Sequence, residues 1–190
     1  MAESEQIISR NKVVAIVGMA GSGKSEVARV FEKDGYVRIR FGDITDEELK
    51  KRGLPRNEEN ERTVREDLRI EYGMAAYAEL NKPKIDQTLE SSNVVIDGLY
   101  SWAEYVELKM KYKEKFFVLA VYSSPATRYS RLLNRQERSL THEEAAERDT
   151  TEIENSDKGG PIAMADFTIV NETSVEDLKR QAAIILAKLK

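Results

Sequence analysis

The chain has 190 residues and a net charge of −4, with no cysteine and a single histidine. The absence of cysteine excludes disulfides, thiolate nucleophiles and zinc–cysteine sites, and His142 alone cannot form a metal cluster. An acidic balance argues against a broad nucleic-acid-binding surface, so we expect a small-molecule partner. Hydrophobic and charged residues make up 41% and 34% of the chain, which fits one globular domain over residues 1–190.

The N-terminal segment MAESEQIISRNK is polar and charged, unlike a secretory signal. No apolar run in the sequence is long enough to span a bilayer. These features predict a cytoplasmic protein with no membrane partner, and they do not indicate an oligomeric state.

The first predicted element is a buried strand, the β-branched run Val13–Val17, which stops at a glycine-rich stretch. A helix is predicted over 25–34, with Gly35 at its C-terminal end. Further strands are predicted at 36–41, 93–97, 116–122 and 167–170, and further helices at 102–111, 125–134 and 175–190. This alternation favours a three-layer α/β/α fold with a mostly parallel five-stranded sheet.

Two connections are longer than a simple crossover requires. Residues 46–92 contain the turn sequence GLPRN and a predicted long helix with Val64, Leu68, Tyr72 and Ala76 on one face. Residues 136–165 are polar and include the glycine pair of Lys158–Pro161. Insertions of this kind typically cover substrates, so we expect an acceptor-binding region at 46–92 and a lid at 136–165.

The glycine-rich stretch Gly18–Ser25 reads GMAGSGKS and fits the phosphate-binding motif G-x-x-x-x-G-K-[ST] in full, between a predicted strand and helix. Its glycines allow main-chain N–H groups to approach phosphate oxygens. Lys24 supplies a charge for the β- and γ-phosphates, and Ser25 a hydroxyl for Mg²⁺. The alternative is an ordinary glycine-rich turn, but the full pattern arises by chance in roughly one chain in a hundred. The predicted nucleotide contacts are Gly18, Met19, Ala20, Gly21, Ser22, Gly23, Lys24, Ser25 and Glu26.

Two aspartates follow predicted strands and therefore lie at the carboxyl edge of a parallel sheet. Asp43, in the sequence FGD, is placed to orient an acceptor or take its hydroxyl proton, although it also suits the N-cap of a helix starting near Ile44. Asp97 ends NVVID and is followed by Gly98, which fits a carboxylate that holds Mg²⁺ with Ser25 or, alternatively, a capping residue.

Arginines gather after the fourth predicted strand. Arg131 and Arg135 share a helical face, and such like charges repel unless an anion joins them. Arg148 lies further on, where it can close over a transferring phosphoryl group. The alternative is that these arginines are solvated and paired with neighbouring glutamates. We prefer that alternative for Arg62, Arg65 and Arg69.

Taken together, these segments resemble the nucleoside monophosphate kinase and dephospho-CoA kinase group over nearly the whole chain. The similar segments are FGD at Phe41–Asp43, VVIDG at Val94–Gly98, SRLLNR at Ser130–Arg135 and ADFTIVNETSVEDL at Ala165–Leu178. The overall resemblance is greatest to a mostly archaeal, dephospho-CoA-kinase-like branch that shares the GxxGSGKSE start, the RxEYG segment and the ADxxIVN ending.

The resemblance implies roles for particular residues. Arg131 would stack on adenine, Asn171 would fall in a turn against the adenine ring, and Arg135 would stabilise the transferred phosphoryl group. One departure is DGLYSW, where adenylate kinases carry an arginine shortly after Asp-Gly. Tyr100 and Trp102 offer instead an aromatic surface or a contribution to the core.

These patterns predict a P-loop NTPase that uses ATP and Mg²⁺ to phosphorylate a nucleoside monophosphate or dephospho-CoA. Its catalytic residues would be Lys24, Asp43, Arg135 and Arg148, its base contacts Arg131 and Asn171, and its metal ligands Ser25 and Asp97. No guanine-recognition signature follows the fourth strand, which favours adenine. The competing hypothesis is a regulatory or scaffold ATPase that uses 46–92 to hold a protein partner.

Overall fold

Five parallel strands form the central sheet in the order β2-β3-β1-β4-β5. Every pairing between neighbouring strands is parallel, so the sheet is parallel throughout. The computed structural model describes residues 11–136 and 138–190, and most of the N-terminal segment discussed above lies outside them. The strands are β1 (Val13–Val17), β2 (Val37–Arg40), β3 (Val94–Asp97), β4 (Phe116–Tyr122) and β5 (Phe167–Val170).

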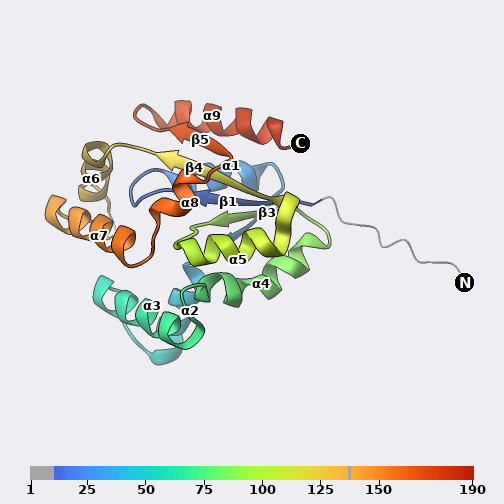
Figure 1. Cartoon of the computed structure of the whole chain (residues 1–190). Helices are drawn as coiled ribbons and strands as arrows, with labels where there is room; N and C mark the ends of the chain where they lie inside the picture. The colour runs from blue at the N-terminus through green and yellow to red at the C-terminus, as the bar shows by residue number, and fades with distance from the viewer. Residues whose placement is uncertain (1–10, 137) are drawn as a thin grey trace, which may run out of the picture.

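Helices cover both faces of this sheet and make three layers, as Figure 1 shows. The helices of the two outer layers are α1 (Lys24–Lys33) and α9 (Val175–Lys188) on one face, and α4 (Ala76–Leu89) and α5 (Trp102–Tyr112) on the other. The remaining helices are α2 (Asp43–Arg52), α3 (Glu58–Tyr72), α6 (Pro125–Leu133), α7 (His142–Glu154) and α8 (Gly159–Ala163), with a 3₁₀ turn at Lys113–Lys115.

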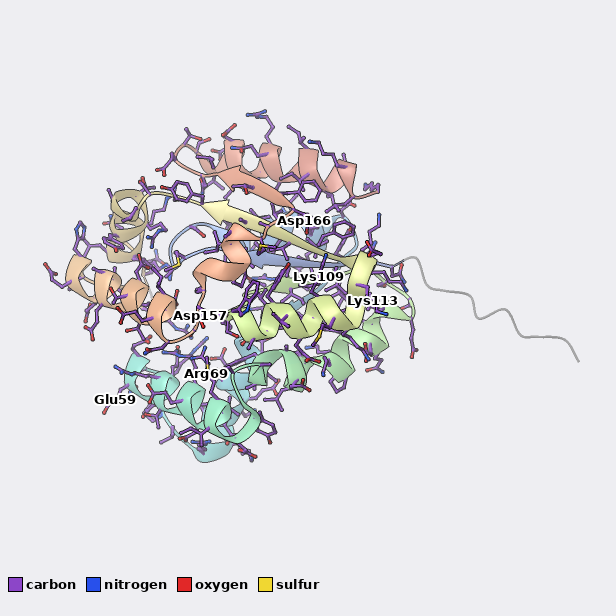
Figure 2. All side chains as sticks on the ribbon, viewed as in Figure 1. Glu59, Arg69, Lys109, Lys113, Asp157 and Asp166 are labelled. Carbon is purple, nitrogen blue, oxygen red and sulfur yellow. The ribbon has the colours of Figure 1, made fainter. Side chains whose placement is uncertain are left out.

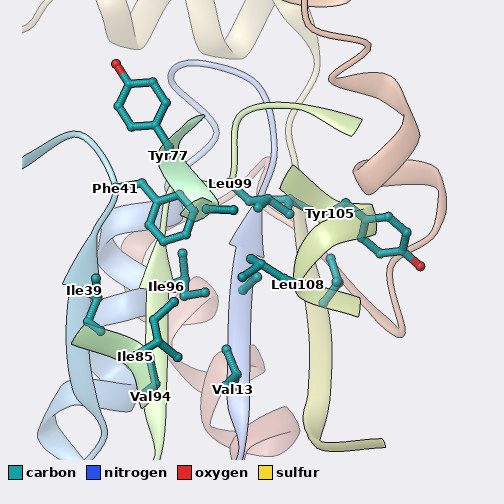
Figure 3. Close-up of a cluster of buried hydrophobic side chains, with 14 of the residues drawn as sticks. Val13, Ile39, Phe41, Tyr77, Ile85, Val94, Ile96, Leu99, Tyr105 and Leu108 are labelled. Carbon is teal, nitrogen blue, oxygen red and sulfur yellow. The ribbon is translucent and has the colours of Figure 1, made fainter. Parts of the chain in front are cut away.

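Strand β1 is buried on both faces because it lies in the middle of the sheet. Val14 and Ile16 pack toward α1 and α9, whereas Val13 and Ala15 pack toward α4 and α5. Figure 3 shows the second of these cores, where the fully buried Tyr77 of α4 lies beyond the end of β3. The continuous apolar run of β1 therefore reflects burial from both sides.

The region 46–92 differs from the predicted single long helix. It contains the end of α2 and all of α3 and α4, and α3 ends at Tyr72 because Gly73 adopts a φ of 78°. Val64 and Leu68 are buried as predicted, but Tyr72 is 44% exposed and Ala76 begins the next helix. The apolar period continued across this glycine in the sequence, which hid the break.

Helix α4 belongs to the core layer, since Tyr77 and Ile85 are fully buried in it. The part of this region that stands over the carboxyl edge of the sheet is formed by α2 and α3 (Figure 1). Across the same edge, residues 136–165 form α7 and α8, apart from residue 137, which lies outside the described residues. None of the described helices combines the length and the apolar character needed to cross a membrane.

A buried hydrogen bond connects the core layer to α2. The Tyr77 and Thr45 hydroxyl oxygens lie 2.6 Å apart, and both residues are buried. We expect Tyr77→Phe to lower the free energy of unfolding by about 1–2 kcal/mol, because the Thr45 hydroxyl is left buried without this partner. Urea denaturation measures the loss. Adding Thr45→Val should recover part of it, and an unchanged midpoint in Tyr77→Phe would contradict this account.

Candidate functional site

The phosphate-loop sequence joins β1 to α1 at the carboxyl edge of the sheet. Its glycines are required by the backbone: Gly21 has a φ of 81° and Gly23 a φ of 103°. A Cβ on Gly23 would lie 2.5 Å from Asn171 Nδ2, so the loop also packs too closely for a side chain there. The result is a tight turn whose amides lead into the N-terminus of α1, where an anion is favoured.

Lys24 is folded back onto this loop. Its Nζ donates to the Met19 carbonyl oxygen over 2.9 Å. Burial, and after it the charge of Lys158, lowers the pKa of Lys24 to about 7. Phosphate oxygens at the loop would offset both effects, because they would add negative charge beside the ammonium to that of Glu152 and Asp97.

Ser25 and Asp97 face each other beside the loop. Ser25 Oγ lies 3.4 Å from Asp97 Oδ1, while the other carboxylate oxygen accepts hydrogen bonds from the Arg38 guanidinium. A hydroxyl and a carboxylate are the donor set that Mg²⁺ takes from a protein when phosphates complete its shell. The described residues hold no group of three or more His, Cys, Asp or Glu side chains that could bind a metal ion by themselves.

Arg38 was not identified from the sequence. It lies on β2, and its guanidinium fixes the orientation of Asp97 from the neighbouring strand. The signal in the sequence was a pair of arginines, Arg38 and Arg40, alternating with apolar residues, but only the strand order shows which carboxylate Arg38 meets.

The predicted base-binding residues lie against the same loop. Asn171 Nδ2 donates to the Ser22 carbonyl oxygen over 2.8 Å, and its Oδ1 accepts from Arg131 over 3.4 Å. Arg131 also donates to the Ser123 hydroxyl over 3.1 Å. Asn171 thus supports the main chain of the loop, and Arg131 lies beside Asn171.

Arg128 has a structural role that the arginine pattern did not reveal. It is buried and forms a two-pronged ion pair with Asp149 of α7, with distances of 3.0 and 2.6 Å. The same guanidinium donates to the Ala20 and Ser123 carbonyl oxygens. Its guanidinium donors are bound to acceptors of the protein itself, so Arg128 has a structural role.

The predicted lid arginines lie close to one another. The pKa of Arg135 is lowered by partial burial and then by the charges of Arg148 and Arg138. Arg148 pairs with Glu152 of its own helix at 3.1 Å and approaches Glu58 of α3 at 3.7 Å. Ion pairs therefore connect the lid to α3.

A cavity of about 690 Å³ lies between α2–α3 and α7. Figure 2 shows Arg69 on α3 and Asp157 just beyond α7 in this part of the molecule. Arg62, Arg65 and Arg69 line the cavity. Arg62 pairs with Glu66 at 3.0 Å and Arg65 with Glu58 at 2.7 Å, as the sequence suggested, whereas Arg69 Nε is buried with no hydrogen-bond partner among the described residues. Asp43 lies at the start of α2, 37% exposed and 3.1 Å from Arg40, which lines the cavity.

Two further charged residues in the cavity wall were missed by sequence reasoning. Lys158 is 3% exposed, and its Nζ donates to Glu152 Oε2 over 2.5 Å and lies 5.5 Å from the centre of the Tyr100 ring. Burial acts to raise the pKa of Glu152, but Lys158 and Arg148 outweigh it and hold that pKa at about 2. The glycines after Lys158 suggested a flexible turn, whereas in the structure they begin α8.

The two aromatic residues after Asp-Gly differ in their positions. Tyr100 lines the cavity, and its hydroxyl lies over Gly98, where a Cβ would be only 2.6 Å away. Trp102 stacks on Tyr105 with ring centres 5.0 Å apart. Tyr100 therefore provides the aromatic surface that the sequence suggested, whereas Trp102, the first residue of α5, packs on Tyr105 of its own helix.

Glu104 supports Tyr100 from behind the cavity wall. It is fully buried, and its Oε2 accepts from the Tyr100 N–H over 2.7 Å, while Oε1 has no hydrogen-bond partner among the described residues. Burial raises the pKa of Glu104 to about 7, although Arg69 and Lys158 act to lower it.

The parallel sheet with its phosphate-loop sequence after β1 defines a P-loop protein of kinase-like fold. The AAA domain family matches residues 14–155. The chain is 37% identical over 181 residues to a UPF0200 protein of Pyrococcus abyssi, covering 93% of this chain and 96% of that one. It is 42% identical over 171 residues to a UPF0200 protein of Pyrococcus furiosus, covering 88% and 91%. The chain belongs to the AAA domain family and to the UPF0200 family.

Solved structures of similar fold include three kinases. A gluconokinase from Sinorhizobium meliloti is 16% identical with a TM-score of 0.58, covering 95% of this chain and 94% of that one. A shikimate kinase from Bacteroides thetaiotaomicron is 14% identical with a TM-score of 0.59, covering 93% and 98%. Dephospho-CoA kinase from Campylobacter jejuni is 14% identical with a TM-score of 0.56, covering 95% and 98%. At these identities the likeness shows the fold.

The pKa of Glu104 gives a test of its burial. Because this pKa is about 7 in the folded state against 4.5 ordinarily, folding takes up a proton between these values, and stability falls as pH rises through them. Glu104→Gln should therefore be more stable than the parent at pH 8, by roughly 2–3 kcal/mol, and nearly equal to it at pH 4.5. Urea denaturation at both pH values measures this.

The matched control is Glu107→Gln, on the same helix, where the carboxylate pairs with Lys82 at 2.7 Å. Its pKa is lowered, first by that hydrogen bond, so this variant should gain no stability at pH 8. Parallel stability curves for Glu104→Gln and the parent would show that the Glu104 carboxyl is not desolvated as described.

Proposed function

We propose that this protein is an ATP- and Mg²⁺-dependent phosphotransferase that moves the γ-phosphoryl group to a small acceptor, a nucleoside monophosphate or dephospho-CoA. One observation carries the proposal. Glu152, Arg148 and Lys158 line the cavity, and the same three charges act on Lys24 of the phosphate loop. The cavity therefore lies within electrostatic range of Lys24, which supports a γ-phosphate site beside it, as direct transfer requires.

On the nucleotide side, Lys24 would follow the β- and γ-phosphates while loop amides hold their oxygens. Ser25 and Asp97 would hold Mg²⁺, which when bound neutralises charge on the phosphate oxygens. Arg131 and Asn171 would lie beside the adenine, since Asn171 contacts the loop at Ser22 and Arg131 contacts Asn171. Arg38 would keep Asp97 aimed at Ser25.

On the acceptor side, the bond between the γ-phosphorus and the β,γ-bridging oxygen breaks as a bond to the acceptor hydroxyl oxygen forms. Asp43 would orient that hydroxyl and accept its proton. Arg135 and Arg148 would stabilise the charge on the transferring group. The ion pairs between the lid and α3 would close the cavity around the acceptor and exclude water.

Several observations support a small hydroxyl-bearing acceptor. The cavity volume is within the range of small-molecule sites, and Tyr100 gives it an aromatic wall. The solved structures of similar fold bear the names of kinases for gluconate, shikimate and dephospho-CoA. The proposal includes a cytoplasmic location, with no nucleic-acid or membrane partner.

Removing the phosphate-loop ammonium tests the reaction. Lys24→Ala should lower kcat by at least about 100-fold, because the charge that follows the phosphoryl group is lost. The exposed Lys33→Ala, on the same helix, should leave kcat unchanged. Coupled ADP release measures both, and full turnover in Lys24→Ala would refute the assignment.

A panel of acceptors distinguishes the kinase from a regulatory or scaffold ATPase. ATP consumption is measured with Mg²⁺ alone and then with each nucleoside monophosphate and with dephospho-CoA. A kinase should be stimulated by one acceptor, with the phosphorylated acceptor detected by mass spectrometry. A flat response across the panel would favour the regulatory ATPase.

A further inference from the structure

Lys158 occupies an unusual position for a lysine. It is the N-cap of α8 and is 3% exposed, yet it lines the cavity beside Tyr100. Glu152 is its ion-pair partner among the described residues. A lysine ammonium has three donors, so this carboxylate leaves donors for a further acceptor.

The surroundings of Lys158 are rich in positive charge. Lys24 and Arg148 belong to the same electrostatic cluster, and Glu152 lies among these cations. Asp97, which is paired with Arg38, acts on Lys24 from another side, and Glu58 lies 3.7 Å from Arg148. With Arg38 included, four cations face three carboxylates here, which leaves an excess of positive charge that an anion would offset. The nearest place for such an anion is between the phosphate loop and the cavity.

The backbone fixes Lys158 in this position. Helix α8 packs on α5, and a Cβ on Gly160 would lie 2.6 Å from the Trp102 ring. The Trp102 N–H donates to the Ser156 carbonyl oxygen over 3.1 Å, which anchors the segment that leads into α8. Lys158 is therefore held by close main-chain packing, as expected of a residue that positions a ligand.

We propose that Lys158 is a phosphoryl-contacting residue whose Nζ donates to a γ-phosphate oxygen of the bound nucleotide, with Glu152 as its counter-ion before the nucleotide arrives. This inference rests on the proposed function, because it takes the space between the phosphate loop and the cavity as the place where the γ-phosphate lies. In the transfer step, Lys158 forms no covalent bond. It keeps its proton and follows the three γ-phosphate oxygens toward the acceptor.

Nucleotide binding tests the contact without turnover. Lys158→Met keeps the length of the side chain and removes the charge. Calorimetry should show that affinity for Mg²⁺ with a non-hydrolysable ATP analogue falls about tenfold, while affinity for Mg²⁺ with ADP changes less than about twofold. A merely structural lysine would weaken both ligands equally, and that result, or no change in either, would overturn the proposal.

Two further variants keep the test decisive if Lys158→Met is unstable. Gly160→Ala leaves the lysine intact but pushes α8 from Trp102, and should reduce the same contrast between analogue and ADP. Lys111→Met, an exposed lysine paired with Asp86 at 3.1 Å, should preserve it. A full contrast in Gly160→Ala with α8 displaced would overturn the proposal. If the contrast holds but no acceptor stimulates turnover, the proposed kinase reaction fails while the Lys158 contact stands.

Discussion

The buried ion pair between Arg128 and Asp149 is the interaction on which the arrangement of the site depends. One guanidinium joins α6 to α7 and also donates to the carbonyl oxygens of Ala20, in the phosphate loop, and Ser123, after β4. Loss of either partner would leave a buried charge without compensation, which costs several kcal/mol. The phosphate loop and α7 are therefore fixed to each other, and the neighbouring Arg148, together with Arg138, meets α3 through more exposed ion pairs.

Local patterns predicted much of this architecture. The apolar runs identified all five strands to within two residues, and the glycine spacing located the phosphate loop, because burial and backbone conformation act on neighbouring residues. The position of Asp97 at the carboxyl edge of the sheet was also predictable, since parallel strands end at the same edge. The break in α3 was missed because Gly73 interrupts a helical period that the apolar residues continue.

Pairings between distant parts of the chain were not predictable in the same way. Arg38 and Asp97 are separated by 59 positions, and they meet only because β2 and β3 are neighbours in the sheet. Lys158 reads as part of a polar loop in the sequence, and its burial depends on α8 packing against α5. The partners and burial of such charged residues depend on strand order and helix packing, and no short sequence pattern encodes these.

The contact between Trp102 and Gly160 makes Trp102 an intrinsic fluorescent probe of α8. Trp102 is the single tryptophan of the chain, it is 38% exposed, and its ring lies against the first turn of α8. Any rearrangement of α8 changes the polarity around this one indole, so its emission spectrum reports on the position of α8 without an attached dye. Rapid-mixing fluorescence can therefore follow such a rearrangement in time.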